Sequence, residues 1–452
     1  MTFDLLLTNG EIVFPGEGVR PGSVAVQDGR IAAILAPGVA AQAREVVDCG
    51  GQWIMPGVID PHTHIGFGDK ENDFRTESRS AALGGVTTLI TFHRSNDLRQ
   101  STGPWIAAGE ADSLIDFTLH FGLTSQLHVD TLKEVAASYG VPSIKMYLMY
   151  KGAAGAAKGF TEIDDGLLYR TLREAAGIPG AVVGAHCENV EVIPAFRPAL
   201  KAAGRQDLAA WDEQSPGFLE AENVFRVGYF GEQAGARVNI VHLSSQEGME
   251  IARWLKARRP AEFNVETCAH YLALTRDLDG IAGKVNPPLR GQADVEALWQ
   301  GIRDGVVTTV GSDHVPRKVA TKGEDLWSAS AGFPGIATLL PVMIEEGWHK
   351  RGIAIETLAA VLSANAADLY GLTSKGRIAV GLDADLIVVD RETPREVRAD
   401  ELASYSDYTP YEGRVLRGWP VATYLRGRPI AAGGRLIPEA DAAPSGRFVA
   451  RR

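Results

Sequence analysis

The middle of the chain alternates between short apolar runs of the β type and longer segments with helical periodicity. Eight β-type runs are predicted as strands: Val58–Asp60, Val86–Phe92, Phe117–Phe121, Ser143–Met146, Ala181–Ala185, Val238–Val241, Phe263–Thr267 and Thr308–Gly311. The helices predicted between them are Arg75–Leu83, Thr131–Tyr139, Asp165–Ala176, Phe218–Gly235 and Gly248–Arg258. This alternation is typical of a parallel sheet with crossover helices, and eight units predict an α/β fold of the (β/α)8 TIM-barrel type. A doubly wound open sheet is the alternative, although no G-x-G-x-x-G turn follows the first strand.

Short strands separated by turns are predicted at both ends of the chain. They are Phe3–Leu7, Ser23–Val26, Arg30–Ile34, Glu45–Val47, Asp385–Val389 and Val421–Leu425. Asn9-Gly10 and Asp28-Gly29 predict hairpin turns, because glycine supplies the positive φ that such turns require. Neither end has enough strands to bury two faces, so we predict that both pair into one small β-sandwich domain. The predicted boundaries are 1–54 and 376–440 for this domain, 55–375 for the barrel and 441–452 for a C-terminal tail.

Composition excludes several classes of protein. The chain has 45 Lys and Arg against 56 Asp and Glu, a net charge of −11, without the basic clusters that bind nucleic acid. Its three cysteines form neither a disulfide framework nor a Cys-rich zinc site. We expect no membrane partner and a cytoplasmic location, since no basic leader and no run of about 18 apolar residues is present. The basic end Arg451-Arg452 is interpreted as incidental.

Side chains of the kinds that bind metal ions fall at the carboxyl ends of the predicted strands. They are His62 and His64 after the first strand, His186 and His242 at the ends of the fifth and sixth, and Asp313 after the eighth. In a (β/α)8 barrel these ends converge on one mouth, where active sites are built. A single histidine there is more often a hydrogen-bonded structural residue, but the joint placement of all five predicts a metal site.

Lys145 lies inside the fourth predicted strand, between Ile144 and Met146. A lysine in an apolar strand is often an edge residue whose ammonium reaches solvent. Alternatively, burial lowers the pKa of the amine, so that its neutral form can react covalently. The spacing by itself does not choose between these two interpretations.

Several segments resemble motifs of the cyclic amidohydrolases, the group that holds hydantoinases, dihydropyrimidinases, allantoinases and dihydroorotases. The similar segments are Ile54–His64, Ser143–Tyr150, His186–Asn189, Glu266–Leu272, Asn286–Arg290, Gly311–His314 and Lys375–Asp385. The resemblance implies two divalent metal ions, usually zinc with other metals possible, held by six side chains. The implied ligands are His62, His64 and Asp313 for the buried ion, His186 and His242 for the exposed ion, and carboxylated Lys145 as the bridge.

The same resemblance implies the reaction. A hydroxide that bridges the two ions would attack the carbonyl carbon of a hydantoin or dihydropyrimidine ring and break the C–N bond. Asp313 would carry the proton to the leaving nitrogen, and Tyr150 would bind the substrate and stabilise the tetrahedral oxyanion. Allantoinase, cyclic-imide hydrolase and dihydroorotase are the alternative activities.

The sequence departs from family patterns at the substrate positions. Dihydroorotases place an arginine two residues after the second metal histidine, where this chain has Gly66. Hydantoinases carry an asparagine after strand eight, where this chain has Ala331, and Asn286 is expected to bind the ring through its backbone instead. His93 and Arg94 follow the second strand and are expected to reach the mouth. Our hypothesis is that Arg94 binds an anionic or carbonyl-rich substituent, with a surface ion pair to Asp97 as the alternative.

A non-catalytic scaffold relative is the alternative from another class of protein. Such a relative would lack some of the metal ligands, whereas all six positions are filled here. In relatives, C-terminal tails cross to a neighbouring subunit. By analogy the tail Pro444–Arg452 implies a homo-oligomer, a tetramer by the same analogy.

Overall fold

The computed structural model describes residues 2–451, whose centre is a sheet of eight parallel strands. The strands are β6 (Val58–Thr63), β7 (Val86–His93), β8 (Asp116–Leu123), β9 (Ser143–Tyr147), β10 (Val182–His186), β11 (Val238–Ile240), β12 (Phe263–Cys268) and β13 (Thr309–Gly311). Each pairs with its neighbour in chain order. A bridge between Thr63 and His314, together with the bond from His64 N–H to the His314 carbonyl (2.8 Å), joins the first strand to the eighth. The predicted (β/α)8 barrel is confirmed.

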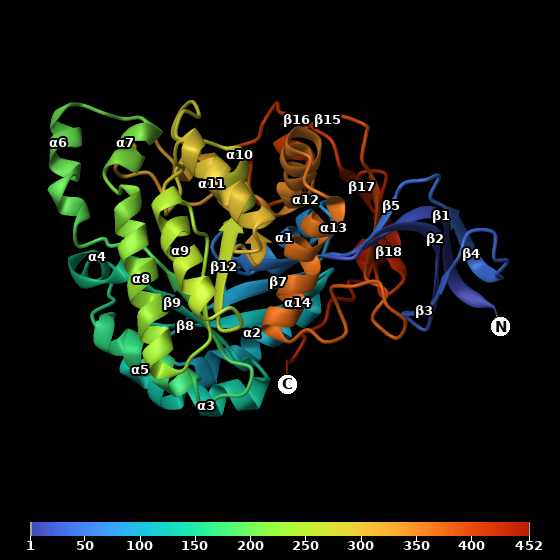
Figure 1. Ribbon diagram of the computed structural model, residues 1–452, viewed down its shortest axis with the longest axis horizontal. Coiled ribbons are helices and arrows are strands. Elements are labelled where there is room, and N and C mark those ends of the chain that lie inside the picture. Colours follow the sequence, from blue (N-terminus) through green and yellow to red (C-terminus); the bar gives the residue numbers. More distant parts are fainter. Residues whose placement is uncertain (1, 452) are drawn as a thin grey trace.

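The helices of residues 2–451 lie around the barrel, most of them on its outside (Figure 1). They are α1 (Asp73–Leu83), α2 (Leu98–Asp112), α3 (Gln126–Tyr139), α4 (Gly152–Ala156), α5 (Asp165–Ala175), α6 (Arg197–Ala202), α7 (Leu208–Glu213), α8 (Gly217–Ala234), α9 (Gln246–Arg258), α10 (Ala269–Ala273), α11 (Gln292–Arg303), α12 (Leu339–Met343), α13 (Ile355–Ala359), α14 (Asn365–Tyr370) and α15 (Pro438–Ala442). Short 3-10 or π turns are η1 (Leu148–Tyr150), η2 (Ile193–Ala195), η3 (Val319–Thr321), η4 (Ile336–Thr338), η5 (Ile344–His349), η6 (Ala360–Ala364) and η7 (Ala399–Glu401). Within residues 2–451, no helix combines the length and the apolar character needed to cross a membrane.

A second sheet of nine strands combines the two ends of the chain beside the barrel (Figure 1). Its strands are β1 (Phe3–Phe14), β2 (Gly18–Gln27), β3 (Arg30–Leu35), β4 (Ala43–Asp48), β5 (Trp53–Pro56), β14 (Leu386–Asp390), β17 (Trp419–Leu425), β18 (Arg428–Ala432) and β19 (Arg435–Leu436). The small pair β15 (Arg395–Glu396) and β16 (Val415–Leu416) lies apart. The N-terminal and C-terminal parts meet where β5 pairs antiparallel with β14, and this pairing confirms that both ends build one β unit. The domain boundaries within this arrangement stay a prediction.

One predicted turn is wrong. Asn9-Gly10 does not end a strand, because β1 continues through it to Phe14 and pairs with β2 on both sides. The positive φ of Asn9 (54°) instead accommodates a β-bulge, at which the register shifts between Leu7 and Gly10. Asp28-Gly29 does form the predicted turn, between β2 and β3.

The C-terminal tail packs against the end of the barrel opposite the mouth. The Val449 N–H donates to the Phe117 carbonyl at the start of β8 (2.8 Å), and the Arg451 N–H donates to the Gly140 carbonyl (2.7 Å). The Arg451 guanidinium is buried and donates to the Leu119 carbonyl. The interpretation of Arg451 as incidental is therefore wrong, because its side chain fills the closed end of the barrel.

A buried cluster of charges connects the barrel to the second sheet. Lys375 lies 2.7 Å from Asp116 at the start of β8 and also pairs with Asp385 beside β14. Arg426, in the turn between β17 and β18, pairs with the same Asp116. Since Lys375, Asp116 and Asp385 are all buried, each charge depends on the others for compensation.

Candidate active site

Three of the predicted ligands form a compact group at the barrel mouth. His62 and His64 lie at the end of β6, and Asp313 lies just after β13 on the neighbouring strand. Asp313 Oδ1 is 3.1 Å from His62 Nε2 and 3.0 Å from His64 Nε2, and the three ligand atoms lie within 4.8 Å of one another. His62 Nε2 is buried and makes no hydrogen bond within residues 2–451. An orphaned ring nitrogen beside a carboxylate is the donor set that a divalent cation fits.

The other three predicted residues adjoin this group. His186 ends β10 and His242 follows β11, with ring centres 4.4 Å apart. Lys145 Nζ, on β9, lies 3.5 Å from His242 Nε2, and the His242 ring centre is 5.2 Å from that of His62. The structure thus brings together all six side chains that the sequence placed at the mouth.

Two of these residues have an uncommon backbone conformation. His242 (φ 43°) and Asp313 (φ 48°) both lie in the left-handed region. For a residue with a Cβ atom this region costs on the order of 1–2 kcal/mol, and it persists only where surrounding contacts hold it. Such strain is concentrated at functional sites, and here both instances are at the ends of barrel strands that point into one mouth.

Burial controls the charge state of the cluster. Burial lowers the pKa of His64 to about 4 and that of Lys145 to about 8. Burial alone would raise the pKa of Asp313, but the charge of His62 and the hydrogen bond of His64 outweigh it and hold that pKa well below its usual value. The site therefore contains a neutral His64 imidazole and an ionised Asp313 carboxylate, both of which can bind a cation, and a lysine that loses its proton more readily than an ordinary lysine.

Two carboxylates outside the predicted set orient the histidines. Glu266 Oε1, on β12, lies 2.5 Å from His62 Nδ1, and Glu188 Oε2 lies 3.2 Å from His186 Nε2. Glu188 also accepts a hydrogen bond from Ser215 Oγ (2.6 Å). Sequence analysis missed both roles. The sequence did offer one signal for these roles, because each acid lies near the end of a predicted barrel strand or just beyond it.

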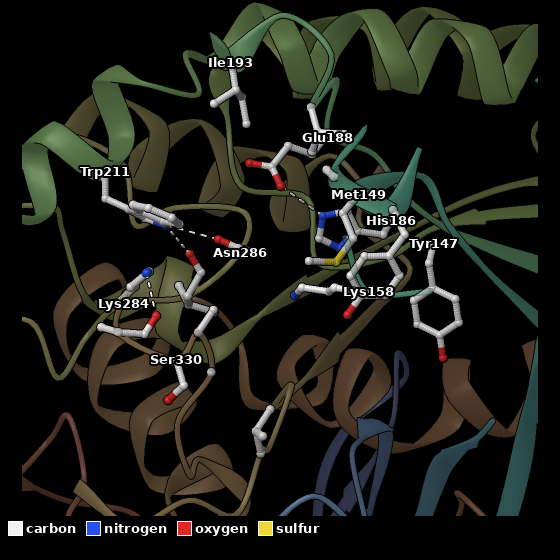
Figure 2. Close-up of a pocket in the computed structure, with 18 of the residues that line it drawn as sticks. Tyr147, Met149, Lys158, His186, Glu188, Ile193, Trp211, Lys284, Asn286 and Ser330 are labelled. Atoms are coloured by element: carbon white, nitrogen blue, oxygen red, sulfur yellow. Dashed lines mark hydrogen bonds and ion pairs between the residues drawn. The ribbon is translucent and has the colours of Figure 1, made fainter. Parts of the chain in front are cut away.

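A cavity of about 940 Å³ opens above the cluster and has both apolar and cationic walls. Figure 2 shows Trp211 and Asn286 on one side and His186, Met149 and Tyr147 on the other. Trp211 Nε1 donates to the Asn286 side-chain oxygen (3.1 Å) and to the Val285 carbonyl (3.0 Å), so it fixes the loop that carries Asn286. Trp211 is a second residue whose role the sequence did not indicate.

The predicted substrate residues Tyr150, Asn286 and Arg94 all line this cavity, and so does Ala331, which occupies the position of the hydantoinase asparagine. Tyr150 lies in η1 and stacks on Phe160, with ring centres 4.8 Å apart. The alternative pairing of Arg94 with Asp97 is not found, because Asp97 pairs with Arg99 (2.9 Å).

His93 does not reach the mouth, and that expectation is wrong. Its Nε2 bonds to Ser101 Oγ (2.8 Å), and its ring stacks on Trp105 of α2. Because successive residues of a strand point to opposite faces, His93 faces the helix layer while Arg94, its neighbour, lines the cavity.

The family to which the chain belongs follows from comparison with known proteins. The amidohydrolase family pattern matches residues 53–430, which include all six cluster residues. The chain belongs to the amidohydrolase family.

Individual relatives in this family are similar over the whole chain. An L-hydantoinase of Paenarthrobacter aurescens is 32% identical over 100% of this chain and 98% of its own length. An allantoinase of Rubrobacter xylanophilus is 34% identical over 99% of this chain and 97% of its own. The solved L-hydantoinase (dihydropyrimidinase) from Arthrobacter aurescens superposes with a TM-score of 0.92 at 30% identity, covering 100% of both chains. The predicted resemblance to the cyclic amidohydrolases is confirmed.

Proposed function

We propose that this amidohydrolase cleaves the C–N bond of a cyclic amide of the hydantoin or dihydropyrimidine type. The observation that carries the proposal is the convergence of six ligand-type side chains from five barrel strands below one cavity. Relatives named L-hydantoinase and allantoinase, similar over nearly the full chain, support the same class of reaction.

The donor set fits two divalent cations, and we propose zinc. His62, His64 and Asp313 would hold one ion, His186 and His242 the other, and carboxylated Lys145 would contact both. When bound, such ions lower the pKa of a water molecule to about neutral and polarise a carbonyl group. Lys145 suits this role because a buried amine with a pKa of about 8 reacts with CO2 to give an anionic carbamate.

The side chains around the cavity have separate proposed roles. Asp313 is ionised, so it can accept the proton of the attacking water and deliver it to the leaving ring nitrogen. The Tyr150 hydroxyl would donate a hydrogen bond to the oxyanion of the tetrahedral intermediate. Asn286, fixed by Trp211, would hold the ring through its backbone amide and carbonyl groups.

A substrate screen tests the proposal. The zinc-loaded protein is assayed with hydantoin, dihydrouracil, allantoin, dihydroorotate and phthalimide, beside an Asp313→Asn variant. We expect hydrolysis of at least one ring and a loss of about 10³-fold or more in Asp313→Asn, since general acid–base catalysis is removed. If the fully metal-loaded protein hydrolyses none of the five rings, the proposal is overturned.

Allantoinase is the second candidate activity, and the 34% identity to the Rubrobacter protein favours it. Relative kcat/KM values for hydantoin and allantoin decide between the two. A non-catalytic scaffold is a third possibility, which metal analysis tests, because a scaffold should purify with well under one metal ion per chain. A homotetramer and a cytoplasmic location stay proposals, and the three cysteines, all free and buried, are compatible with a reducing compartment.

A further inference from the structure

The wall of the active-site cavity has more positive charge than its own carboxylates balance. Most of its charged groups have partners. Lys151 pairs with Glu191 and Asp165, Arg197 donates to Gln214, Lys284 donates to the Leu326 and Ala329 carbonyls, and Glu188 is bound by His186 and Ser215. Within residues 2–451, the cavity cations whose side chains have neither an ion pair nor a hydrogen bond to a protein acceptor are Arg94, Lys158 and Arg317. The donors of these three side chains are therefore available to a ligand.

Arg317 is the most enclosed of the three. It lies four residues after Asp313, in the loop that follows β13. Its Nε is buried and has no hydrogen-bond partner in the described chain, and its guanidinium forms no ion pair there. Its backbone N–H is fixed by Ser406 Oγ (2.9 Å), so the loop is anchored while the charged end lines the cavity. Burial lowers the pKa of Arg317, which indicates that its charge is poorly solvated.

Arg94 reaches the cavity from the end of β7 and is surrounded by aromatic rings. Its guanidinium carbon lies 5.0–5.8 Å from the ring centres of Phe67, Tyr147, Tyr150 and Phe160. Ring faces hold a cation in place, but they do not satisfy its N–H donors. The four rings thus orient the guanidinium and leave its hydrogen-bonding capacity for another group.

Tyr150 connects these cations in space. The Arg94 guanidinium is 5.7 Å from its ring centre, and Lys158 Nζ is 5.0 Å from the same ring. Figure 2 shows the amine of Lys158 pointing into the middle of the cavity. Arg317 lines the same cavity. Arg94 and Lys158 therefore lie beside the tyrosine that we place next to the reacting carbonyl.

We propose that Arg317 and Arg94 form a subsite for an anionic substituent, a carboxylate, carried by the cyclic amide substrate. The inference rests on the proposed function and names the substrate class of that site. A carboxylate would supply the missing acceptor for the buried donor of Arg317 and compensate the charge of Arg94. A neutral substituent would leave both guanidinium groups desolvated and unpaired. The site should therefore bind substrates with a neutral substituent less well than substrates with a carboxylate.

A matched pair of substrates tests the subsite. Hydantoin-5-acetic acid and hydantoin-5-acetamide have nearly the same shape and differ in charge. With the zinc-loaded protein we expect the ratio of kcat/KM, acid over amide, to be on the order of 10 to 100, the value of one or two charge-assisted hydrogen bonds. In Arg317→Met and in Arg94→Met the ratio should fall toward 1. In Arg99→Met, which replaces the exposed arginine in the first turn of α2 that pairs with Asp97, the ratio should stay as in the wild type.

The outcomes separate this inference from the proposed function. If the amide is hydrolysed as efficiently as the acid, the subsite is overturned while the proposed reaction stands. If neither derivative is hydrolysed while another ring of the substrate screen is, the subsite is likewise overturned. If neither derivative nor any of the five rings of the screen is hydrolysed, the proposed function fails and the inference fails with it. Two independent variants guard against misfolding of one, and each must show a wild-type far-UV circular dichroism spectrum. A ratio that both properly folded variants leave unchanged would also overturn the subsite.

Discussion

Glu266 Oε1 lies 2.5 Å from His62 Nδ1, and both side chains are at most 1% exposed. This contact fixes the orientation of the ring, with Nδ1 toward Glu266 and Nε2 toward Asp313. The end of β12 therefore sets the geometry of the end of β6, although the two residues are 204 positions apart in the chain.

The first prediction concerns this contact. In Glu266→Gln the amide cannot accept the histidine proton with the strength of a carboxylate, so we expect metal affinity to fall about 10- to 100-fold. Competition with a chromogenic chelator measures it. Glu250→Gln, an exposed acid on α9, is the matched control and should bind metal as the wild type does. Unchanged affinity in Glu266→Gln would contradict an orienting role.

The second prediction concerns the pH dependence of Lys145 carboxylation. Only the neutral amine attacks CO2, losing a proton to give the carbamate anion. With a pKa of about 8, roughly a tenth of the amine is neutral at pH 7, far more than for an ordinary lysine. In metal-free protein with 13C-bicarbonate, we expect the carbamate signal in NMR to rise from pH 7 to pH 9. The signal should be missing in Lys145→Arg, and its absence from the wild type at pH 9 would refute the proposal.

The third prediction separates transition-state stabilisation from substrate binding at Tyr150. Loss of the hydroxyl in Tyr150→Phe should lower kcat about 10²-fold on the best substrate, because an oxyanion donor is removed. KM should change much less, since the ring that stacks on Phe160 is retained. Tyr139→Phe, at the end of α3, is the control. A rise in KM with normal kcat would contradict the prediction, because it would show that Tyr150 binds the ground state and the transition state equally.

The fourth prediction concerns the charge cluster between the two sheets. Lys375→Met leaves Asp385 buried without its cation, and loss of one partner of a buried pair costs about 3–5 kcal/mol. Without Lys375, the pKa of the Asp385 carboxyl in the folded protein lies above its pKa in the unfolded chain. The free energy of unfolding therefore falls as the pH rises from the unfolded pKa through the folded pKa. We therefore expect the deficit in the free energy of unfolding to be smaller at pH 5 than at pH 7. Lys350→Met removes a half-exposed lysine whose partner Glu346 keeps its ion pairs with Arg351 and Arg414, so it should cost under about 1 kcal/mol.

The barrel and the position of its site could be predicted because both depend on local sequence patterns. Alternating apolar runs define the strands wherever they are, and the topology of a parallel barrel brings every strand end to the same mouth. Asp313 could thus be placed beside His62 without any contact information. At Asn9 the sequence predicted a turn where the structure has a bulge. Both use the same positive φ, and only the strand pairing distinguishes them.

By itself, then, the sequence determined the fold class, the six residues at the mouth and the family of the chain. Only the tertiary structure decided that Glu266 orients His62, that His242 and Asp313 adopt left-handed backbone, and that His93 faces away from the cavity. It also decided that Arg317 has no acidic partner among residues 2–451 and that Arg451 fills the closed end of the barrel. The physical reason is that strand periodicity is a local property. The partner, charge balance and burial of a polar side chain depend on groups that lie tens to hundreds of residues away.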